Sequence, residues 1–231
     1  MGTASKMFNQ VINEGRKNLL ETEAKSVCRE YGIPTPKFEL AKNGTEAAKL
    51  ADSIGYPVVL KIVSPDVVHK SDVDGVKVNL KNSEDVKAAY EQIIENVKKH
   101  CSKARIAGIL VQEMAPQSTE VIVGAVKDPQ FGPTVMFGLG GIFVEVLKDV
   151  TFMIAPVTED EALEMVRDVK AYPLLTGYRN LPKADINAIA NILVNTSKMV
   201  TEHEEIKELD LNPIMVYKKG AKVVDARIIL E

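Results

Sequence analysis

Apolar residues recur along the chain with two periods, one typical of helices and one typical of strands. Five segments show the helical spacing: residues 21–31, 45–53, 83–100, 158–170 and 184–201. Short apolar or alternating runs predict strands at residues 38–40, 58–63, 76–80, 106–114, 120–126, 131–137, 144–155, 206–217 and 222–230. Helices and strands that alternate without an internal repeat predict a mixed α/β (α+β) fold.

Residues at the ends of these segments suit the start or the end of a helix. Thr45, Ser83 and Thr158 are predicted to be N-caps, and Gly32 is expected to end the first helix. Residues 1–20 are polar and are expected to form a peripheral arm or a short helix. No change of composition marks a domain boundary, so two lobes that share a cleft are expected rather than separate domains.

Composition excludes several classes of function. The chain of 231 residues has a net charge of -3, no Trp and no long Lys/Arg block, so no nucleic acid is expected as a partner. No apolar run approaches the ~18 residues of a membrane span, and no signal-peptide core is present. Cys28 and Cys101 lack a metal-ligand spacing and are expected to be reduced thiols, which favours a cytoplasmic enzyme.

Polar residues near the C-terminus are predicted to gather on one face of a hairpin. Side chains alternate along a strand, so Asp210 and Asn212 share a face. A turn at residues 217–220 places Asn212 opposite Asp225, and Asp210 opposite Arg227. Such a face is equally typical of a solvent-exposed hairpin. Its oxygens also suit Mg²⁺, which takes a few protein oxygens together with nucleotide phosphates.

A lysine and a histidine stand out in the first half of the chain. Lys61 interrupts an apolar strand, and it either points to water at a sheet edge or enters a cleft and neutralises a phosphate. The polar loop of residues 64–75 contains His69. A loop histidine is usually only solvated, but Lys70 and the small residues nearby favour anion binding, and a neutral imidazole is a competent phosphoryl acceptor.

Three weaker features follow in the sequence. Residues 111–116 end a buried strand at a proline and are typical of a hinge whose backbone can read an adenine edge. Glu120 can contact a ribose or simply face solvent. The glycines of residues 138–141 lack the G-x-G-x-x-G spacing, so close backbone approach at a lobe or subunit interface is expected of them instead.

An ordered set of motifs resembles one known family. The segments are residues 31–34 (YGIP), 55–61 (GYPVVLK), 64–73 (SPD and HKSDV), 131–133 (FGP), 137–141 (FGLGG), 208–213 (ELDLNP) and 225–227 (DAR). From about residue 21 to residue 227, the chain is similar to the ATP-grasp (beta) subunit of ADP-forming acetyl-CoA synthetase. It is more distantly similar to the beta subunit of succinyl-CoA synthetase.

This resemblance implies an ATP-grasp fold with a nucleotide cleft between two lobes. The N-terminal lobe would span residues 21–111 with a phosphohistidine loop at 64–75, and the C-terminal lobe residues 112–231, after an N-terminal arm of residues 1–20. The family usually has Gly-Gly where this chain has Asp74-Gly75. That departure puts the loop's geometry in doubt more than its function.

The resemblance also implies ligands and roles. The cofactors would be ATP/ADP and Mg²⁺. Lys61 would contact nucleotide phosphates, Glu120 would reach the ribose, and the adenine would be held by Gln112, Glu113 and Met114.

The metal and the transferred phosphoryl group have implied residues of their own. Asn212 and Asp225 would ligate Mg²⁺, which agrees with the register argument. His69 would accept the phosphoryl group, with Asp210 orienting its imidazole. The partner would be a CoA-binding alpha subunit, in an alpha2beta2 assembly.

Two other functions fit the same fold. One is a self-contained carboxylate–amine ligase, which activates its substrate without a histidine relay. The other is a non-catalytic ATP-binding sensor.

Overall fold

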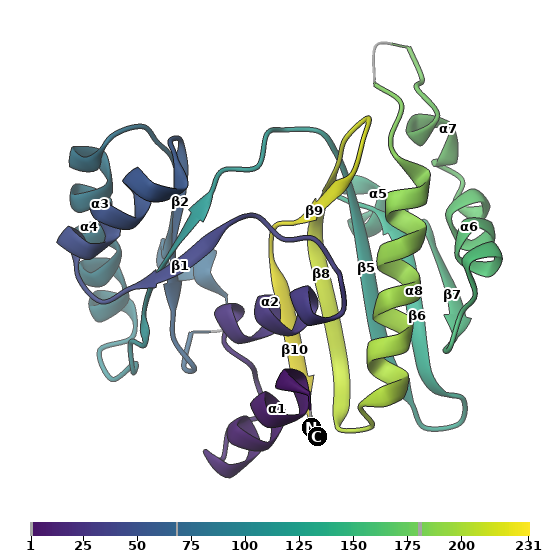
Figure 1. The fold of residues 1–231 in the computed structure, drawn as a ribbon, viewed down its shortest axis with the longest axis horizontal. Coiled ribbons are helices and arrows are strands. Elements are labelled where there is room, and N and C mark those ends of the chain that lie inside the picture. The colour runs from purple at the N-terminus through teal and green to yellow at the C-terminus, as the bar shows by residue number, and fades with distance from the viewer. Residues whose placement is uncertain (1, 68, 180–181) are drawn as a thin grey trace. The chain divides into compact units, whose positions relative to one another are not determined.

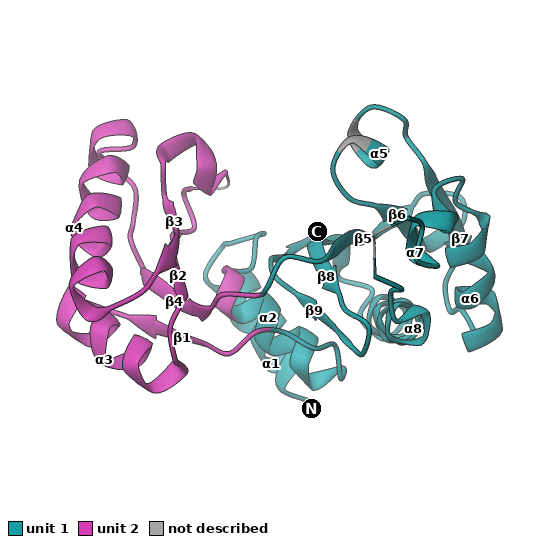
Figure 2. Cartoon of the chain, turned by 90° about the horizontal axis from the view of Figure 1, so that it is seen from above, with its two compact units in different colours: residues 1–19, 23–35, 116–231 teal, residues 20–22, 36–115 magenta. Residues whose placement is uncertain are grey.

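The chain folds into two compact units, shown in different colours in Figure 2. The computed structural model describes residues 2–67, 69–179 and 182–231. Unit 1 comprises residues 1–19, 23–35 and 116–231, and unit 2 comprises residues 20–22 and 36–115. This division differs from the expected boundaries, because most of the N-terminal 35 residues cluster with the C-terminal half of the chain.

Unit 2 is a four-stranded antiparallel sheet covered by two helices. Its strands, in spatial order, are β1 (Phe38–Ala41), β4 (Gly108–Glu113), β2 (Val58–Val63) and β3 (Val76–Leu80). The helices α3 (Gly44–Ile54) and α4 (Ser83–His100) pack against each other and against the sheet (Figure 1). Leu60, Ile62 and Ile93 lie in the apolar core between these layers. A short 3₁₀ turn, η1 (Lys70–Val73), precedes β3.

Unit 1 contains a larger antiparallel sheet. Its strands run in the order β10 (Ala226–Leu230), β8 (Ile206–Val216), β5 (Thr119–Asp128), β6 (Gly132–Leu139) and β7 (Val150–Ile154), and β9 (Ala221–Val223) also pairs with β8. The long helix α8 (Ile186–Glu202) runs over β5 and β6 (Figure 1) and packs beside α6 (Glu159–Asp168). The remaining helices are α1 (Thr3–Asn13), α2 (Glu21–Glu30), α5 (Ile142–Glu145) and α7 (Tyr172–Leu175). All belong to unit 1 except the first two residues of α2, which belong to unit 2.

The expected N-terminal arm is a helix that packs into the core of unit 1. Phe8 and Val11 of α1 are completely buried there. Both side chains lie on one face of the helix together with Ala4, so only a few buried apolar positions signal the contact. An apolar stripe that narrow is easily mistaken for a surface segment.

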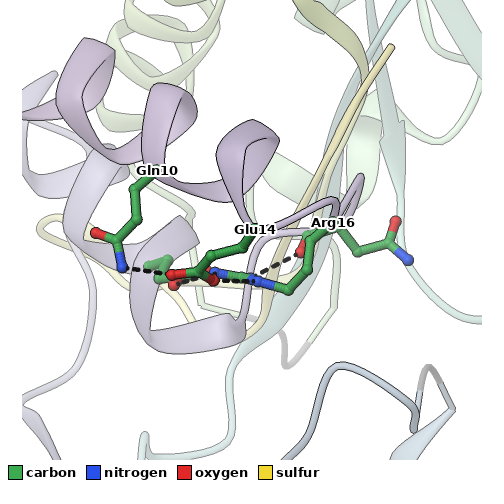
Figure 3. Close-up of polar contacts among 5 residues, drawn as sticks. Gln10, Glu14 and Arg16 are labelled. Carbon is green, nitrogen blue, oxygen red and sulfur yellow. Dashed lines mark hydrogen bonds and ion pairs between the residues drawn. The ribbon is translucent and has the colours of Figure 1, made fainter.

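Polar contacts tie the end of α1 to the start of the next helix (Figure 3). Arg16 donates two hydrogen bonds to the carboxylate of Glu23, at 2.9 and 2.8 Å, and a third to Glu14 at 2.8 Å. Gln10 also donates to Glu14. The hydrogen bonds from Gln10 and Arg16 lower the pKa of Glu14, and those to Glu23 raise the pKa of Arg16. The Arg16–Glu23 fork is the kind of bidentate pair that fixes geometry.

Helix caps show where the sequence prediction was right and where it was wrong. Thr158 caps α6 in a full capping box, as predicted. The caps of α3 and α4 are Asn43 and Asn82, whose side chains each accept a helix amide, rather than Thr45 and Ser83. Asn is as good an N-cap as Ser or Thr, and it stands directly before each helix.

The region from residue 144 to residue 155 is less extended than expected. It begins in the short helix α5, and the strand β7 starts only at Val150. Within the described ranges, no helix combines the length and apolar character that crossing a membrane requires.

Candidate functional site

The C-terminal hairpin has the predicted register. Arg227 pairs with Asp210 across β8 and β10, and the amide of Asn212 donates to the carbonyl of Asp225 at 3.2 Å. The turn is closed by a hydrogen bond from Tyr217 N to Gly220 O, which centres it between Lys218 and Lys219. Paired residues of antiparallel strands share a face. Asp210, Asn212, Asp225 and Arg227 therefore belong to one side of the hairpin.

A bulge in β8 changes the direction in which the side chains near Asn212 point. Val123 of β5 pairs with Leu211 of β8, and Val121 pairs with Ile214. A step of two residues along β5 therefore corresponds to a step of three residues along β8. One extra residue of β8 is thus inserted around Asn212, and the buried positions shift phase at that point. Bulges of this kind are common beside functional sites because they redirect a side chain. Here the bulge leaves Asn212 exposed.

Asp210 is half-buried, and its surroundings on balance oppose its ionisation. Burial raises the pKa of Asp210 above the usual 3.8, and the negative charges of Asp225 and Glu208 act in the same direction. Arg227 acts against them. A partly desolvated carboxylate beside an arginine is a strong hydrogen-bond acceptor, which suits the orientation of a cationic or N–H-bearing ring.

Asn212 and Asp225 offer a donor set that fits Mg²⁺. Asn212 of β8 supplies an amide oxygen and is exposed, and Asp225, between β9 and β10, supplies a carboxylate oxygen and is half-buried. Mg²⁺ commonly takes one or two protein ligands and completes its octahedron with water and phosphate oxygens. Among the described residues no three His, Cys, Asp or Glu side chains gather as a cage. The pair therefore suits a cation that arrives with a nucleotide better than a resident structural ion.

Lys61 is buried rather than exposed at a sheet edge. β2 lies between β4 and β3, and only 5% of Lys61 is exposed. Its Nζ donates to Oε1 of Glu21 at 2.8 Å. The other carboxylate oxygen of Glu21 lies 2.8 Å from Nζ of Lys70. The structure therefore brings Lys61 together with the residue that follows His69.

His69 is exposed at the start of η1. It is the residue before the first turn, and its side chain makes no capping hydrogen bond. Asp74 ends the turn with a left-handed backbone, φ 47 and ψ 40, which Asp tolerates better than most residues. The position where the family usually has glycine thus adopts the glycine-like conformation.

Gly75 is required for a different reason, namely close packing. A Cβ at this position would lie 2.6 Å from Cγ2 of Ile62 and 3.0 Å from the carbonyl oxygen of Lys70. The amide of Gly75 also donates to that carbonyl. The end of η1 is therefore pressed directly against β2.

Two carboxylates to which the sequence analysis assigned no role hold the loop on either side of His69. Asp66 accepts three hydrogen bonds from Arg105, one from its backbone amide and two from its guanidinium. These bonds lower the pKa of Asp66 to about 2. Asp74 accepts from Lys77 at 2.6 Å and from Asn96 at 3.0 Å. Periodicity places Lys77 in a predicted strand and Asn96 in a predicted helix, but it does not indicate which carboxylate either side chain contacts.

The predicted adenine hinge is part of unit 2. Gln112 is fully buried, while Glu113 and Met114 are half-buried at the end of β4. The amide of Glu113 donates to Lys37 O, and that of Met114 donates to Pro57 O. These two donors already hold the end of β4 to its neighbours.

Glu120 is one of the residues that line a cavity in unit 1. The cavity has a volume of about 460 Å³ and is lined by both polar and apolar residues, among them Ser118, Leu139 and Phe143. The amide of Gly140 donates to the carbonyl of Glu120 at 2.9 Å, and a Cβ at Gly140 would lie 3.0 Å from the Glu120 Cβ. The close backbone approach expected of this glycine segment therefore occurs within the sheet of unit 1.

The predicted site residues fall on both units. Those of the loop, of β2 and of the hinge belong to unit 2, and those of β5 and of the C-terminal hairpin belong to unit 1. A model of the ATP-grasp domain matches residues 10–230. The chain is 50% identical over 233 residues to the beta subunit of acetate–CoA ligase [ADP-forming] II from Pyrococcus furiosus, covering 100% of this chain and 99% of that one. The chain belongs to the ATP-grasp beta subunits of ADP-forming acetate–CoA ligases.

Solved structures of an acetyl-CoA synthetase from Ca. Korarchaeum cryptofilum lead to the same family. One, in complex with coenzyme A and Ca-AMPCP, has a TM-score of 0.97 and 55% identity, covering 99% of this chain and 100% of that chain. A second, with Mg-AMPPCP, has its phosphohistidine segment pointing towards the nucleotide binding site, with a TM-score of 0.88, 51% identity and the same coverage. A third has a phosphorylated phosphohistidine segment in the site I orientation, with a TM-score of 0.93, 52% identity and the same coverage.

Proposed function

We propose that this ATP-grasp chain is the nucleotide-binding subunit of an ADP-forming acid–CoA ligase. In this proposal it moves a phosphoryl group between ATP/ADP and His69, which passes the group to a CoA-binding alpha subunit. The observation that carries the proposal is the environment of His69, an exposed imidazole followed directly by Lys70, which pairs with the same carboxylate, Glu21, as the buried Lys61 of β2. The phosphohistidine segment of the Korarchaeum relative supports a histidine rather than another acceptor.

The chemistry assigned to each residue follows from its position. A neutral imidazole nitrogen attacks the γ-phosphorus, the N–P bond forms, and the bond to the β-phosphate oxygen breaks, releasing ADP. Lys61 places a positive charge beside the transferred group. Asp210 accepts the N–H of the second ring nitrogen and stabilises the positive charge that the ring gains. Bound Mg²⁺ would be held by Asn212 and Asp225, and it supplies charge neutralisation on the phosphates.

The remaining nucleotide contacts are proposed from the motifs that the chain shares with its family. Gln112, Glu113 and Met114 would hold the adenine, and Glu120 would contact the ribose. An alpha2beta2 assembly is proposed because the relatives are named as beta subunits. A cytoplasmic location is proposed because Cys28 and Cys101 are both free thiols.

Labelling with ATP radioactive at the γ-phosphate tests the proposal. We expect an acid-labile, base-stable label on the peptide that contains His69, as a phosphoramidate requires. His69→Ala should abolish this label and the synthesis of acyl-CoA in the presence of the alpha subunit, while the affinity for ATP changes less than about 3-fold. Full acyl-CoA formation by His69→Ala would rule out the relay.

A further inference from the structure

Glu21 connects the loop that contains His69 to the buried central strand β2. It is the first residue of α2 and is 7% exposed. Its Oε1 forms an ion pair with Nζ of Lys61, and its Oε2 forms one with Nζ of Lys70, each at 2.8 Å. A buried carboxylate held between two ammonium groups is strongly favoured in one geometry, because removing either partner leaves charge in a poorly solvated place.

We propose that Glu21 is a positioning residue that docks the histidine segment, defined here as residues 69–73, against β2. This proposal rests on the proposed function, because it assumes that His69 moves between the nucleotide and a second acceptor. The Lys70–Glu21 pair holds the segment beside Lys61, and the pair breaks whenever His69 moves to a distant acceptor. Glu21 itself contacts neither nucleotide nor phosphoryl group in this scheme.

Chain geometry requires the pair to break. His69 and Lys70 are consecutive, so their Cα atoms stay about 3.8 Å apart in any conformation. Lys70 reaches Glu21 with its side chain. The length of that side chain therefore limits how far the segment can move while the ion pair stays intact. A displacement of the imidazole well beyond the length of one lysine side chain separates Nζ from the carboxylate.

Other contacts hold the two ends of the loop independently of Glu21. Arg105 binds Asp66 before the histidine segment, and Lys77 and Asn96 bind Asp74 after it. Loss of the Lys70–Glu21 pair should therefore release the segment alone and leave the rest of unit 2 folded. Lys70 is also the safer position to alter, because its loss leaves the buried Glu21–Lys61 pair intact.

Hydrogen exchange without nucleotide tests the docking directly. The amides of Asp72 and Asp74 donate to His69 O and Ser71 O within the turn, so their exchange reports its opening. We expect Lys70→Met to speed exchange at both amides by roughly 10- to 100-fold, the effect of losing one hydrogen bond to a charged group. Lys70→Arg should keep exchange close to that of the unaltered chain.

A double-mutant cycle separates docking from general destabilisation. Glu21→Gln combined with Lys70→Met should open the turn no more than the larger single effect, because both changes remove the same contact. Glu23→Gln is the matched control: it removes an acid of the same helix that pairs with Arg16, and exchange at the turn should not change. Unchanged exchange in Lys70→Met, or fully additive single effects, would overturn the proposal. The exchange experiment uses no nucleotide, so its result is independent of the labelling experiment. If exchange changes as expected but ATP never labels His69, the relay is disproved and the docking by Glu21 is retained.

Discussion

Asp210 is held in an environment that favours its protonated form. Its pKa is raised above 3.8 by burial, and Asp225 and Glu208 act in the same direction. The folded chain therefore binds this proton more tightly than the unfolded chain does. As pH rises from 3.8 through the raised pKa, ionisation of this residue progressively lowers the free energy of unfolding.

Asp210→Asn should therefore stabilise the fold at pH 7 while it impairs catalysis. The gain in unfolding free energy, measured by urea denaturation, should disappear below pH 3.8, where the native carboxyl is already neutral. Turnover with the alpha subunit should fall by roughly 100-fold, because the imidazole loses its orienting acceptor. Glu161→Gln provides the contrast, since the capping box lowers the pKa of Glu161 and its neutralisation should destabilise. A loss of stability in Asp210→Asn at pH 7 would contradict this account.

The proposed metal ligands should share one phenotype. We expect Asn212→Ala and Asp225→Ala each to raise the Mg²⁺ concentration for half-maximal phosphorylation of His69 by at least about 10-fold, because each removes an oxygen from the cation. Magnesium titrations at saturating ATP provide the measurement. Glu208→Ala removes a negative charge from the same strand without removing a proposed ligand, so its titration curve should stay near that of the unaltered chain. Unchanged curves in the two Ala variants would remove both residues from the metal site.

Single residues were predictable from sequence where the rule that places them is local. The pairing of Asp210 with Arg227 follows from a turn only a few residues away and from the alternation of strands. Glu21 was not predictable in this way, because 40 residues separate it from Lys61 and only the tertiary fold brings them together. The sequence suggested a phosphate as the partner of Lys61 and gave no sign of the carboxylate.

At the scale of elements, the loop with His69 depends on how tightly its last residues pack on β2. Gly75→Ala should lower the unfolding free energy by about 1–3 kcal/mol, since its new Cβ would lie 2.6 Å from Ile62. Labelling of His69 should also slow, because Lys70 O is among the atoms that must shift. Gly44→Ala is the control, as its Cβ would meet no atom closer than 3.5 Å and its φ is not positive. Equal stability of the two variants, measured by thermal or urea unfolding, would contradict the close packing at Gly75.

Elements with a strong period were predicted well, and short ones were not. The long helices α4 and α8 and the strand β2 lie within a few residues of their expected bounds. The helices α5 and α7 were not predicted, because a helix of four residues is too short to show a periodic pattern. The apolar stripe of α1 is narrow and packs against residues from the other end of the chain. Local periodicity therefore could not predict that this helix is part of the core of unit 1.

At the scale of the whole molecule, the chain divides its proposed chemistry between two units. Unit 2 has the histidine and the lysines, and unit 1 has the carboxylates of the C-terminal hairpin. The sequence predicted a two-lobed fold, but not that residues 23–35 cluster with the C-terminal half. That assignment depends on packing such as the burial of Ala24, Val27 and Cys28 in the core of unit 1. Helical periodicity identifies this apolar face but cannot specify the sheet it covers.

The relay also predicts that the chain alone stops halfway. With ATP and Mg²⁺ it should form at most one phosphohistidine per chain and release an equal amount of ADP, then stop, because a phosphorylated His69 has no acceptor. Adding the alpha subunit, CoA and a carboxylic acid should convert this single burst into continuous ADP release, with acyl-CoA formed in equal amount. A quench-flow assay that follows ADP and thioester together measures both phases. His69→Ala with the alpha subunit should show neither the burst nor the steady phase. Steady acyl-CoA synthesis by the chain alone would show that this polypeptide contains the whole reaction, and the division of labour between subunits would be wrong.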